Sequence, residues 1–233
     1  MDLWQEKASE ELTAFLGGFL KIEKVIFTGS ILDPKSLDMF SDVDITVYLA
    51  DDYAFQMKEL IDGLLRKFDV FGYETYSHDD KDLLRICFAT GWRFDLSIIH
   101  NGKNVIRQAD YSFEDAIDVN VNKFWFIAVM VLVKLGRNDY LIASHLALEL
   151  CQLTIVSQML VRDQVKNTNI HRFGDMEDVP ILHSLSLFDN TDDTEGAIIR
   201  ILYMATERMD VLSEDIYPGY IRKSGCLKTL LGQ

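Results

Sequence analysis

Apolar residues recur with two different periods along the chain, and the period changes once. In the first hundred residues, alternating apolar and polar positions are typical of short strands, and apolar residues at every third or fourth position indicate two amphipathic helices. The predicted helices cover residues 2–20 and 54–68, and the predicted strands cover residues 25–28, 43–49, 70–76, 83–89 and 92–99. Thr90-Gly91 lies between the last two strands and predicts a tight antiparallel hairpin.

Helical periodicity dominates from about residue 112 onward. The predicted helices cover residues 113–135, 140–161 and 195–212, with a polar break at 136–139 between the first two. We therefore predict an α+β fold in two domains. Residues 1–110 form a mixed sheet with helices, and residues 111–233 form a helical bundle.

The chain is acidic, with 37 Asp and Glu against 23 Lys and Arg and a formal net charge of −14 over 233 residues. Proteins that bind nucleic acid through its phosphates need clustered Lys and Arg, so this balance argues against a nucleic-acid partner. It is compatible with a cationic small molecule, which an acidic cleft attracts, although acidity often serves only to keep a protein soluble. The length suits one or two compact domains with a sizeable core.

The three cysteines are odd in number and far apart, at Cys87, Cys151 and Cys226. The first two lie in apolar segments, which indicates buried hydrophobic residues rather than a disulfide framework or a zinc site, and favours a reducing cytoplasm. The acidic N-terminus lacks the basic region of a signal peptide. The very apolar segment 124–135 is too short to span a bilayer, so we expect a buried bundle helix and no membrane association.

The pattern that bears most on function lies in the first two predicted strands. Gly29-Ser30 ends one strand, and after eleven residues Asp42-Val43-Asp44 opens the next. Side chains alternate faces along a strand, so Asp42 and Asp44 share one face while Val43 points into the core. Two carboxylates on one face repel each other unless a cation lies between them, and Mg²⁺ is usually held by one or two carboxylates plus substrate phosphates. Each part alone has an ordinary explanation, a turn or a solvated strand end; the combination predicts a magnesium site.

A third carboxylate, Asp95, interrupts the apolar strand at 92–99. Phe94 and Leu96 lie on the opposite face of that strand. An unpaired carboxylate in so apolar a strand is costly, so a partner is expected. That partner is either a metal ion or an arginine, and the pattern leaves both open.

Together, Gly29-Ser30, Asp42-Val43-Asp44 and Asp95 resemble the nucleotidyltransferase superfamily, which includes kanamycin nucleotidyltransferase and polymerase beta. Further segments resemble the bacterial aminoglycoside 6-adenylyltransferases, with lincosamide nucleotidyltransferases a near second; they are residues 122–125, 134–137 and 223–227. The resemblance implies a nucleotidyltransferase catalytic domain in residues 1–110 and a helical C-terminal domain in residues 111–233. It implies a cytoplasmic enzyme, a monomer or homodimer, that moves AMP from ATP (or the monophosphate of another NTP) to a hydroxyl of a small molecule such as an aminoglycoside or lincosamide antibiotic.

Within that resemblance, Asp42, Asp44 and Asp95 are the expected catalytic and metal-binding residues. Asp42 and Asp44 would hold Mg²⁺, and Asp95 would bind a second metal ion or take the acceptor proton as general base. The backbone N–H groups of Gly29 and Ser30 would bind the phosphates of ATP, aided by a helix that begins after Ser30.

Charged residues of the helical half each have a functional and a structural interpretation. Lys134 and Arg137 could neutralise the triphosphate or be surface charges. Glu149 could bind a cationic acceptor or act as a base, or it could pair with a Lys or Arg of a neighbouring helix. A second function also suits an acidic, half-helical chain: an antitoxin-type nucleotidyltransferase that modifies or binds a partner protein. Nucleic-acid tailing is disfavoured by the charge.

Overall fold

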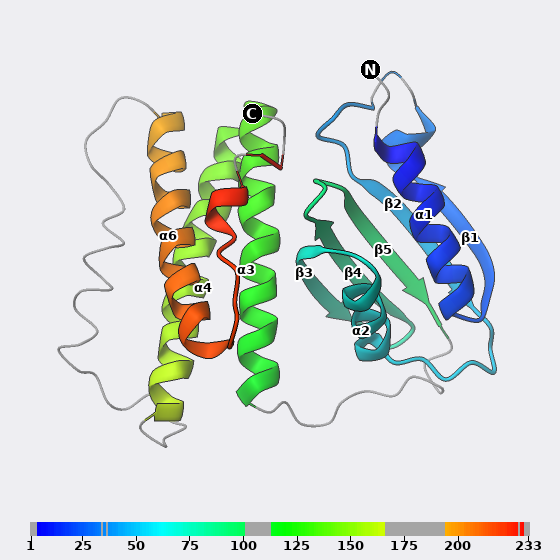
Figure 1. Ribbon diagram of the computed structural model, residues 1–233. Helices are drawn as coiled ribbons and strands as arrows, with labels where there is room; N and C mark the ends of the chain where they lie inside the picture. The colour runs from blue at the N-terminus through cyan, green and yellow to red at the C-terminus, as the bar shows by residue number, and fades with distance from the viewer. Residues whose placement is uncertain are drawn as a thin grey trace. The chain divides into compact units, whose positions relative to one another are not determined.

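The computed structural model describes residues 4–33, 35, 37–100, 113–165, 194–227 and 229–230. The chain divides into two compact units, Met1–Asp110 and Tyr111–Gln233. The first is built around a β-sheet and the second from long helices (Figure 1). A mixed sheet with helices, followed by a helical part, confirms the predicted α+β class.

The first unit forms a single five-stranded sheet in its described residues. Its elements in chain order are α1 (Trp4–Phe19), β1 (Ile22–Thr28), the 3₁₀ turn η1 (Gly29–Leu32), β2 (Val43–Leu49), α2 (Met57–Lys67), β3 (Val70–Ser77), β4 (Lys81–Phe88) and β5 (Arg93–Ile99). The strand order is β1-β2-β5-β4-β3; β2 and β5 run parallel, and the other neighbours run antiparallel. The predicted hairpin is confirmed as the β4–β5 pair.

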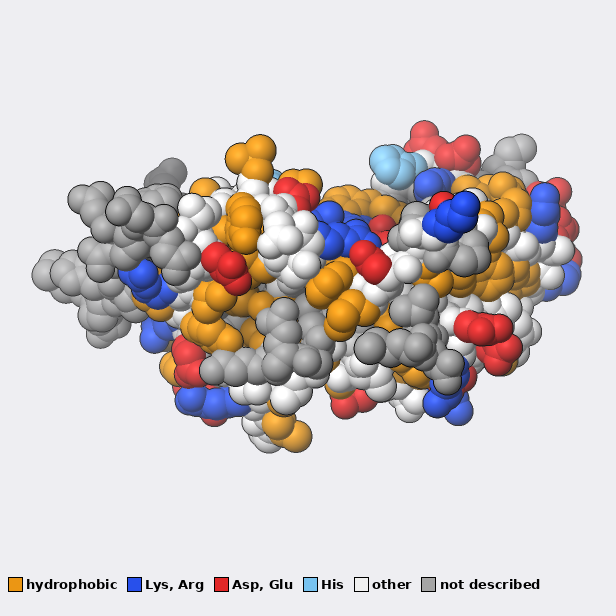
Figure 2. Space-filling model, turned by 90° about the horizontal axis from the view of Figure 1, so that it is seen from above, with side chains coloured by type: hydrophobic (Ala, Val, Ile, Leu, Met, Phe, Trp, Pro, Cys, Tyr) orange, Lys and Arg blue, Asp and Glu red, His pale blue; other side chains and the backbone are white. Residues whose placement is uncertain are grey.

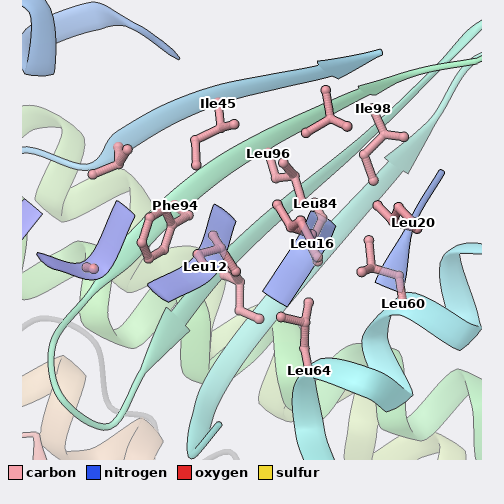
Figure 3. Packing of buried hydrophobic residues seen from close by; sticks show 14 of the residues in the cluster. Leu12, Leu16, Leu20, Ile45, Leu60, Leu64, Leu84, Phe94, Leu96 and Ile98 are labelled. Carbon is pink, nitrogen blue, oxygen red and sulfur yellow. The ribbon is translucent and has the colours of Figure 1, made fainter. Parts of the chain in front are cut away.

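One face of this sheet carries the core of the first unit. Figure 3 shows apolar side chains of the strands packed against those of α1 and α2; they include Ile45, Leu84, Phe94, Leu96 and Ile98 from the sheet, Leu12 and Leu16 from α1, and Leu60 and Leu64 from α2. Burying such a side chain contributes about 2 kcal/mol. Along β2 every second residue is buried and the residues between are only partly covered, so the predicted alternation is confirmed. Asp44 and Asp95 therefore lie on the opposite face of the sheet.

The chain after Ser30 does not form the predicted helix. Gly29–Leu32 is a single 3₁₀ turn, and Asp33 already has extended backbone angles (φ −123°, ψ 96°). Asp33 precedes Pro34 in the sequence, and a residue before proline is disfavoured in the helical region, which explains the early end. A turn this short provides no helix dipole for a phosphate, so that part of the sequence prediction is wrong.

The second unit is a helical bundle. Its described elements are α3 (Phe113–Gly136), α4 (Tyr140–Val165), α6 (Thr194–Ile216) and the 3₁₀ turn η4 (Ser224–Cys226). The helix α4 packs against both α3 and α6. The bend between α3 and α4 passes through Asn138, which has positive φ (58°), and the Asp139 carboxylate accepts a hydrogen bond from the Ile142 N–H at the start of α4.

Both α3 and α4 are long and apolar enough, by length and composition, to cross a membrane. The length argument made for segment 124–135 does not hold for all of α3, because the helix extends over Phe113–Gly136. The apolar stretch of α3 is mostly buried (61%), whereas that of α4 is buried to only 33%. Two such helices are weak evidence for a membrane span, because core helices of soluble proteins have the same length and composition. Cys87 and Cys151 are buried free thiols, as predicted, and Cys226 is exposed.

Candidate active site

One residue from each of the five strands lies in a continuous row across the sheet. Thr28 of β1 is opposite Asp44 of β2, which is opposite Asp95 of β5. Asp95 is in turn opposite Arg85 of β4, and Arg85 is opposite Glu74 of β3. Residues paired across neighbouring strands point to the same face, so this row places two carboxylates side by side at the β2–β5 junction.

Asp42 and Asp44 lie on either side of Val43, whose side chain is fully buried in the core. Asp42 directly precedes β2, and Asp44 is its second residue. Burial, and next the negative charge of Asp42, raise the pKa of Asp44, whereas Arg85 lowers it. The two carboxylates therefore act on each other as like charges, which is the environment that a divalent cation relieves.

Gly29 lies directly against the Asp44 carboxylate. Its backbone has positive φ (72°), which favours glycine, and a Cβ at this position would overlap Asp44 Oδ2. The two requirements are independent, one conformational and one steric. Gly29 thus lets the η1 backbone approach a carboxylate that any other residue would displace. Ser30, the second predicted phosphate-binding residue, follows it in η1.

Arg85 is the partner of Asp95. Its Nε donates to both Asp95 carboxylate oxygens at 3.1 Å, and its Nη1 donates to Glu74 Oε1 at 2.7 Å. The Tyr76 hydroxyl donates to the other Glu74 oxygen at 2.8 Å. The sequence left two possible partners for Asp95, a metal ion or an arginine. In the described residues its partner is the arginine.

The charge state of Asp95 reflects opposing influences. Burial raises its pKa to about 6, and the charges of Asp42 and Asp44 act in the same direction, against the lowering effect of Arg85. A carboxyl group that titrates this close to neutrality is suited to exchange a proton. The raised pKa also shows that Arg85 alone does not compensate for burial beside two other acids.

The carboxylates of the site fit magnesium only in part. Among the residues that the structure describes, no group of three or more His, Cys, Asp or Glu side chains is arranged to hold a metal ion. A preformed site with Asp42, Asp44 and Asp95 as ligands is therefore not found, and their metal binding stays a prediction. A smaller set fits: Mg²⁺ takes one or two carboxylates and completes its shell with water and substrate phosphates, and Asp42 and Asp44, close enough for their charges to interact, provide that number.

Arg85 and Glu74 were missed by the sequence interpretation. A two-residue turn at Thr90-Gly91 would place Ile86 opposite Asp95, but the observed register is centred on Thr90 and places Arg85 there. A difference of one residue in register changes which face of the sheet a side chain joins, so the predicted turn did not identify Arg85. Glu74 and Arg85 lie equally far from Asp79 and Asp80, and the register shift of β3 between Val70 and Gly72 lies beyond them, so a turn predicted at 79–80 would have identified this pair.

The charged candidates of the helical unit have structural partners or remain at its surface. Glu149 of α4 pairs with Lys123 of α3 at 2.8 Å, which confirms the interpretation as a pair between helices. Arg137 is exposed, and Lys134 is partly buried in the last turn of α3. On the face in view in Figure 2, the basic side chains that are coloured lie in separate small groups among acidic and apolar ones.

The segment 223–227 is held by a buried carboxylate of α6. Asp210 is fully buried and accepts hydrogen bonds from the N–H groups of Lys223 (2.9 Å) and Ser224 (3.0 Å) and from the Tyr220 hydroxyl (2.9 Å). The Lys223 ammonium lies 5.9 Å from the centre of the Trp125 ring of α3. These contacts give the segment a structural role in closing the bundle.

Comparisons with known proteins give only distant structural likeness. No family model matches the chain, and no curated protein matches it either. Among solved structures, the chain is similar to an aminoglycoside 6-adenyltransferase from Bacillus subtilis, with 14% sequence identity and a TM-score of 0.30 over 96% of this chain and 95% of that one. A TM-score this low carries no conclusion about activity. What the chain does must follow from the residues on its sheet.

Proposed function

We propose that the protein is a magnesium-dependent nucleotidyltransferase that moves a nucleoside monophosphate, AMP from ATP as the first choice, to a hydroxyl of a small molecule. The observation that supports it is the grouping of Asp42, Asp44 and Asp95 at the β2–β5 junction, with the Gly29 backbone against Asp44. This arrangement leaves like charges crowded at one end of a sheet. Such crowding is destabilising unless the carboxylates bind a ligand. A cation that carries phosphates has the opposite charge and would relieve the repulsion.

The proposed reaction makes few demands on the protein. The acceptor hydroxyl oxygen bonds to the α-phosphorus, the bond from that phosphorus to the bridging oxygen of pyrophosphate breaks, and pyrophosphate leaves with the electron pair. Positioning and charge stabilisation supply most of the rate in such transfers. Magnesium held by Asp42 and Asp44 would neutralise phosphate charge.

Asp95 is assigned the role of general base, which accepts the proton of the acceptor hydroxyl. Its pKa of about 6 leaves it ionised at neutral pH, yet basic enough to accept a proton. Arg85 fixes both of its oxygens through one nitrogen, which sets the orientation of the carboxylate and leaves lone pairs on each oxygen. Its role as general base is preferred to that of metal ligand because the described residues contain no three-ligand cluster.

The acceptor is proposed to be a polyhydroxylated cation of the aminoglycoside type, or a lincosamide. A formal net charge of −14 and carboxylates concentrated at the site favour a positively charged molecule with a free hydroxyl. The enzyme would act in the cytoplasm, where ATP and Mg²⁺ are available, as a monomer or homodimer.

The direct test is mass spectrometry of a reaction that contains the protein, Mg²⁺, ATP and a pooled panel of aminoglycosides and lincosamides. We expect one AMP added to a panel member and an equal amount of pyrophosphate. Asp44→Asn should lower transfer at least about a hundredfold, the scale of losing one charge-stabilising group. Asp52→Asn is the matched control, because Asp52 is an exposed residue that pairs only with Lys21 among the ion pairs of the described residues.

Two results would count against the proposal. Full transfer by Asp44→Asn would show that the carboxylates are not the catalytic site. No adduct on any panel member with any of the four common NTPs would remove the small-molecule acceptor, and AMP found instead on a co-purifying protein would support the antitoxin-type alternative.

A further inference from the structure

The turn that leads into Asp42 is held from outside by buried side chains. The turn comprises residues 38–41, and Gln5 of α1 donates from its Nε2 to the carbonyl oxygens of Asp38 (2.8 Å) and Ser41 (3.0 Å). Gln5 is fully buried; these two bonds satisfy its Nε2, whereas its Oε1 has no hydrogen-bond partner among the described residues. The turn therefore accounts for the buried donor of Gln5.

Arg93 of β5 holds the same turn from the other side. Its Nη2 donates to the carbonyl oxygens of Met39 (2.9 Å) and Ser41 (3.4 Å), and its Nη1 donates to that of Gly91 (2.6 Å). The guanidinium is almost completely buried (2% exposed) and lies 5.3 Å from the Trp4 ring centre. Burying a charge is costly, so a site that keeps an arginine here has a use for its several fixed donors.

The turn is also rigid within itself. The Asp38 carboxylate accepts hydrogen bonds from the Phe40 N–H (2.9 Å) and the Ser41 hydroxyl (2.8 Å), while the Ser41 Oγ accepts one from the Asp38 N–H (3.1 Å). A rigid turn with fixed ends transmits its position to the next residue. That residue is Asp42, and Arg93 lies on the strand that carries Asp95 two positions later.

We propose that Arg93, with Gln5, is a positioning residue that fixes Asp42 relative to Asp44 and Asp95 and so preorganises the carboxylates for a divalent cation. The proposal rests on the function proposed above. Its physical basis is the same as for any outer partner of a metal ligand: the ligand binds best when its backbone is already where the ion needs it. Loss of the guanidinium would remove one donor from each of two turn carbonyls and let Asp42 move away from Asp44.

The test compares three variants in the full chain. Arg93→Met and Gln5→Met remove the donors and keep an unbranched side chain, whereas Leu60→Ala opens a cavity in the same core without touching the turn. Two properties are measured without nucleotide: hydrogen exchange of a peptide spanning 37–44, and the Kd for Mn²⁺ by calorimetry. All measurements are made where urea titration shows each variant to be folded.

We expect Arg93→Met and Gln5→Met to speed exchange in 37–44 and to raise the Mn²⁺ Kd by about 10- to 100-fold, the usual effect of losing an outer-shell partner. Leu60→Ala should change neither property. Arg93→Lys, which keeps the charge but has one nitrogen for two carbonyls, should fall between Arg93→Met and the unmodified protein.

Wild-type exchange or a wild-type Mn²⁺ Kd in folded Arg93→Met would overturn the proposal, and so would an unmodified protein that binds no Mn²⁺. The two proposals fail separately. If Arg93→Met weakens Mn²⁺ binding but the unmodified protein transfers no nucleotide, the positioning role holds and the proposed reaction is wrong.

Discussion

Replacing Arg85 with methionine would leave two carboxylates without their shared cation. Arg85 binds Asp95 through Nε and Glu74 through Nη1, and Glu74 is only 6% exposed. Breaking a buried ion pair by removing one partner destabilises a protein by about 3–5 kcal/mol. About a quarter of the Arg85 and Asp95 side chains is exposed, so we expect the low end of this range at pH 8, about 3 kcal/mol.

The loss of stability in Arg85→Met should depend on pH, and the pKa of Asp95 sets the direction. Because its pKa is raised from 3.8 to about 6 in the folded protein, the folded state binds this proton more tightly than the unfolded state. Its contribution to stability is therefore greatest below pH 4 and is lost as the pH rises through 6. Removing Arg85 removes the lowering influence on this pKa, so at pH 5 Asp95 is protonated and the unpaired-charge penalty is confined to Glu74. We expect less than half of the pH 8 loss to remain there.

Urea unfolding of Arg85→Met at pH 8 and pH 5 measures both quantities. Lys21→Met is the matched control, because it removes the cation of an exposed pair with Asp52 and should change little at either pH. Adding Asp95→Asn to Arg85→Met should recover part of the loss at pH 8. Unchanged stability of Arg85→Met at pH 8, or an equal loss at both pH values, would refute this account of the site.

Three further predictions follow from the same contacts. Gly29→Ala should lose about 1–2 kcal/mol by urea unfolding from its left-handed backbone, and about a hundredfold in AMP transfer because its Cβ displaces Asp44; Gly219→Ala, with similar φ and open space, should show only the first effect. Transfer by the unmodified protein should rise with pH through about 6 as Asp95 ionises, and this rise should be missing in the residual rate of Asp95→Asn. Asp210→Ala should lower thermal stability by about 3 kcal/mol, because it leaves three buried or half-buried donors unsatisfied; a smaller loss than in an exposed Asp→Ala variant would contradict its role.

Strand β2 shows how much of the fold follows from local pattern. Its predicted bounds, 43–49, are those observed, because alternation of Val43, Ile45 and Val47 with polar residues has one consistent placement against a core. Helix α2 begins three residues later than predicted, at Met57, since no capping side chain marks its start. The carboxylate placement followed from the same alternation.

The partners of the site residues were harder to predict. Arg85 could not be placed opposite Asp95 from the predicted turn at Thr90-Gly91, because the observed hairpin is centred on Thr90 and its register differs by one residue. Arg93 could not be predicted as a partner of the turn either: the Met39 and Ser41 carbonyls that it binds are more than fifty positions away, and carbonyls are common to every residue. Contacts of a side chain with distant backbone leave no compositional trace in a single sequence.

The parallel pairing of β2 with β5 also has a consequence for how the chain folds. β3, β4 and β5 are consecutive antiparallel strands, and β1 pairs with its successor β2, so both groups close short loops. The β2–β5 junction instead joins segments about fifty residues apart, and pairings of such long range carry the largest loop entropy and are expected to form last. Asp44 and Asp95 meet only at this junction. The pairing of β2 with β5 and the assembly of the carboxylates are then a single kinetic step. Electrostatic repulsion between the carboxylates opposes this last strand pairing.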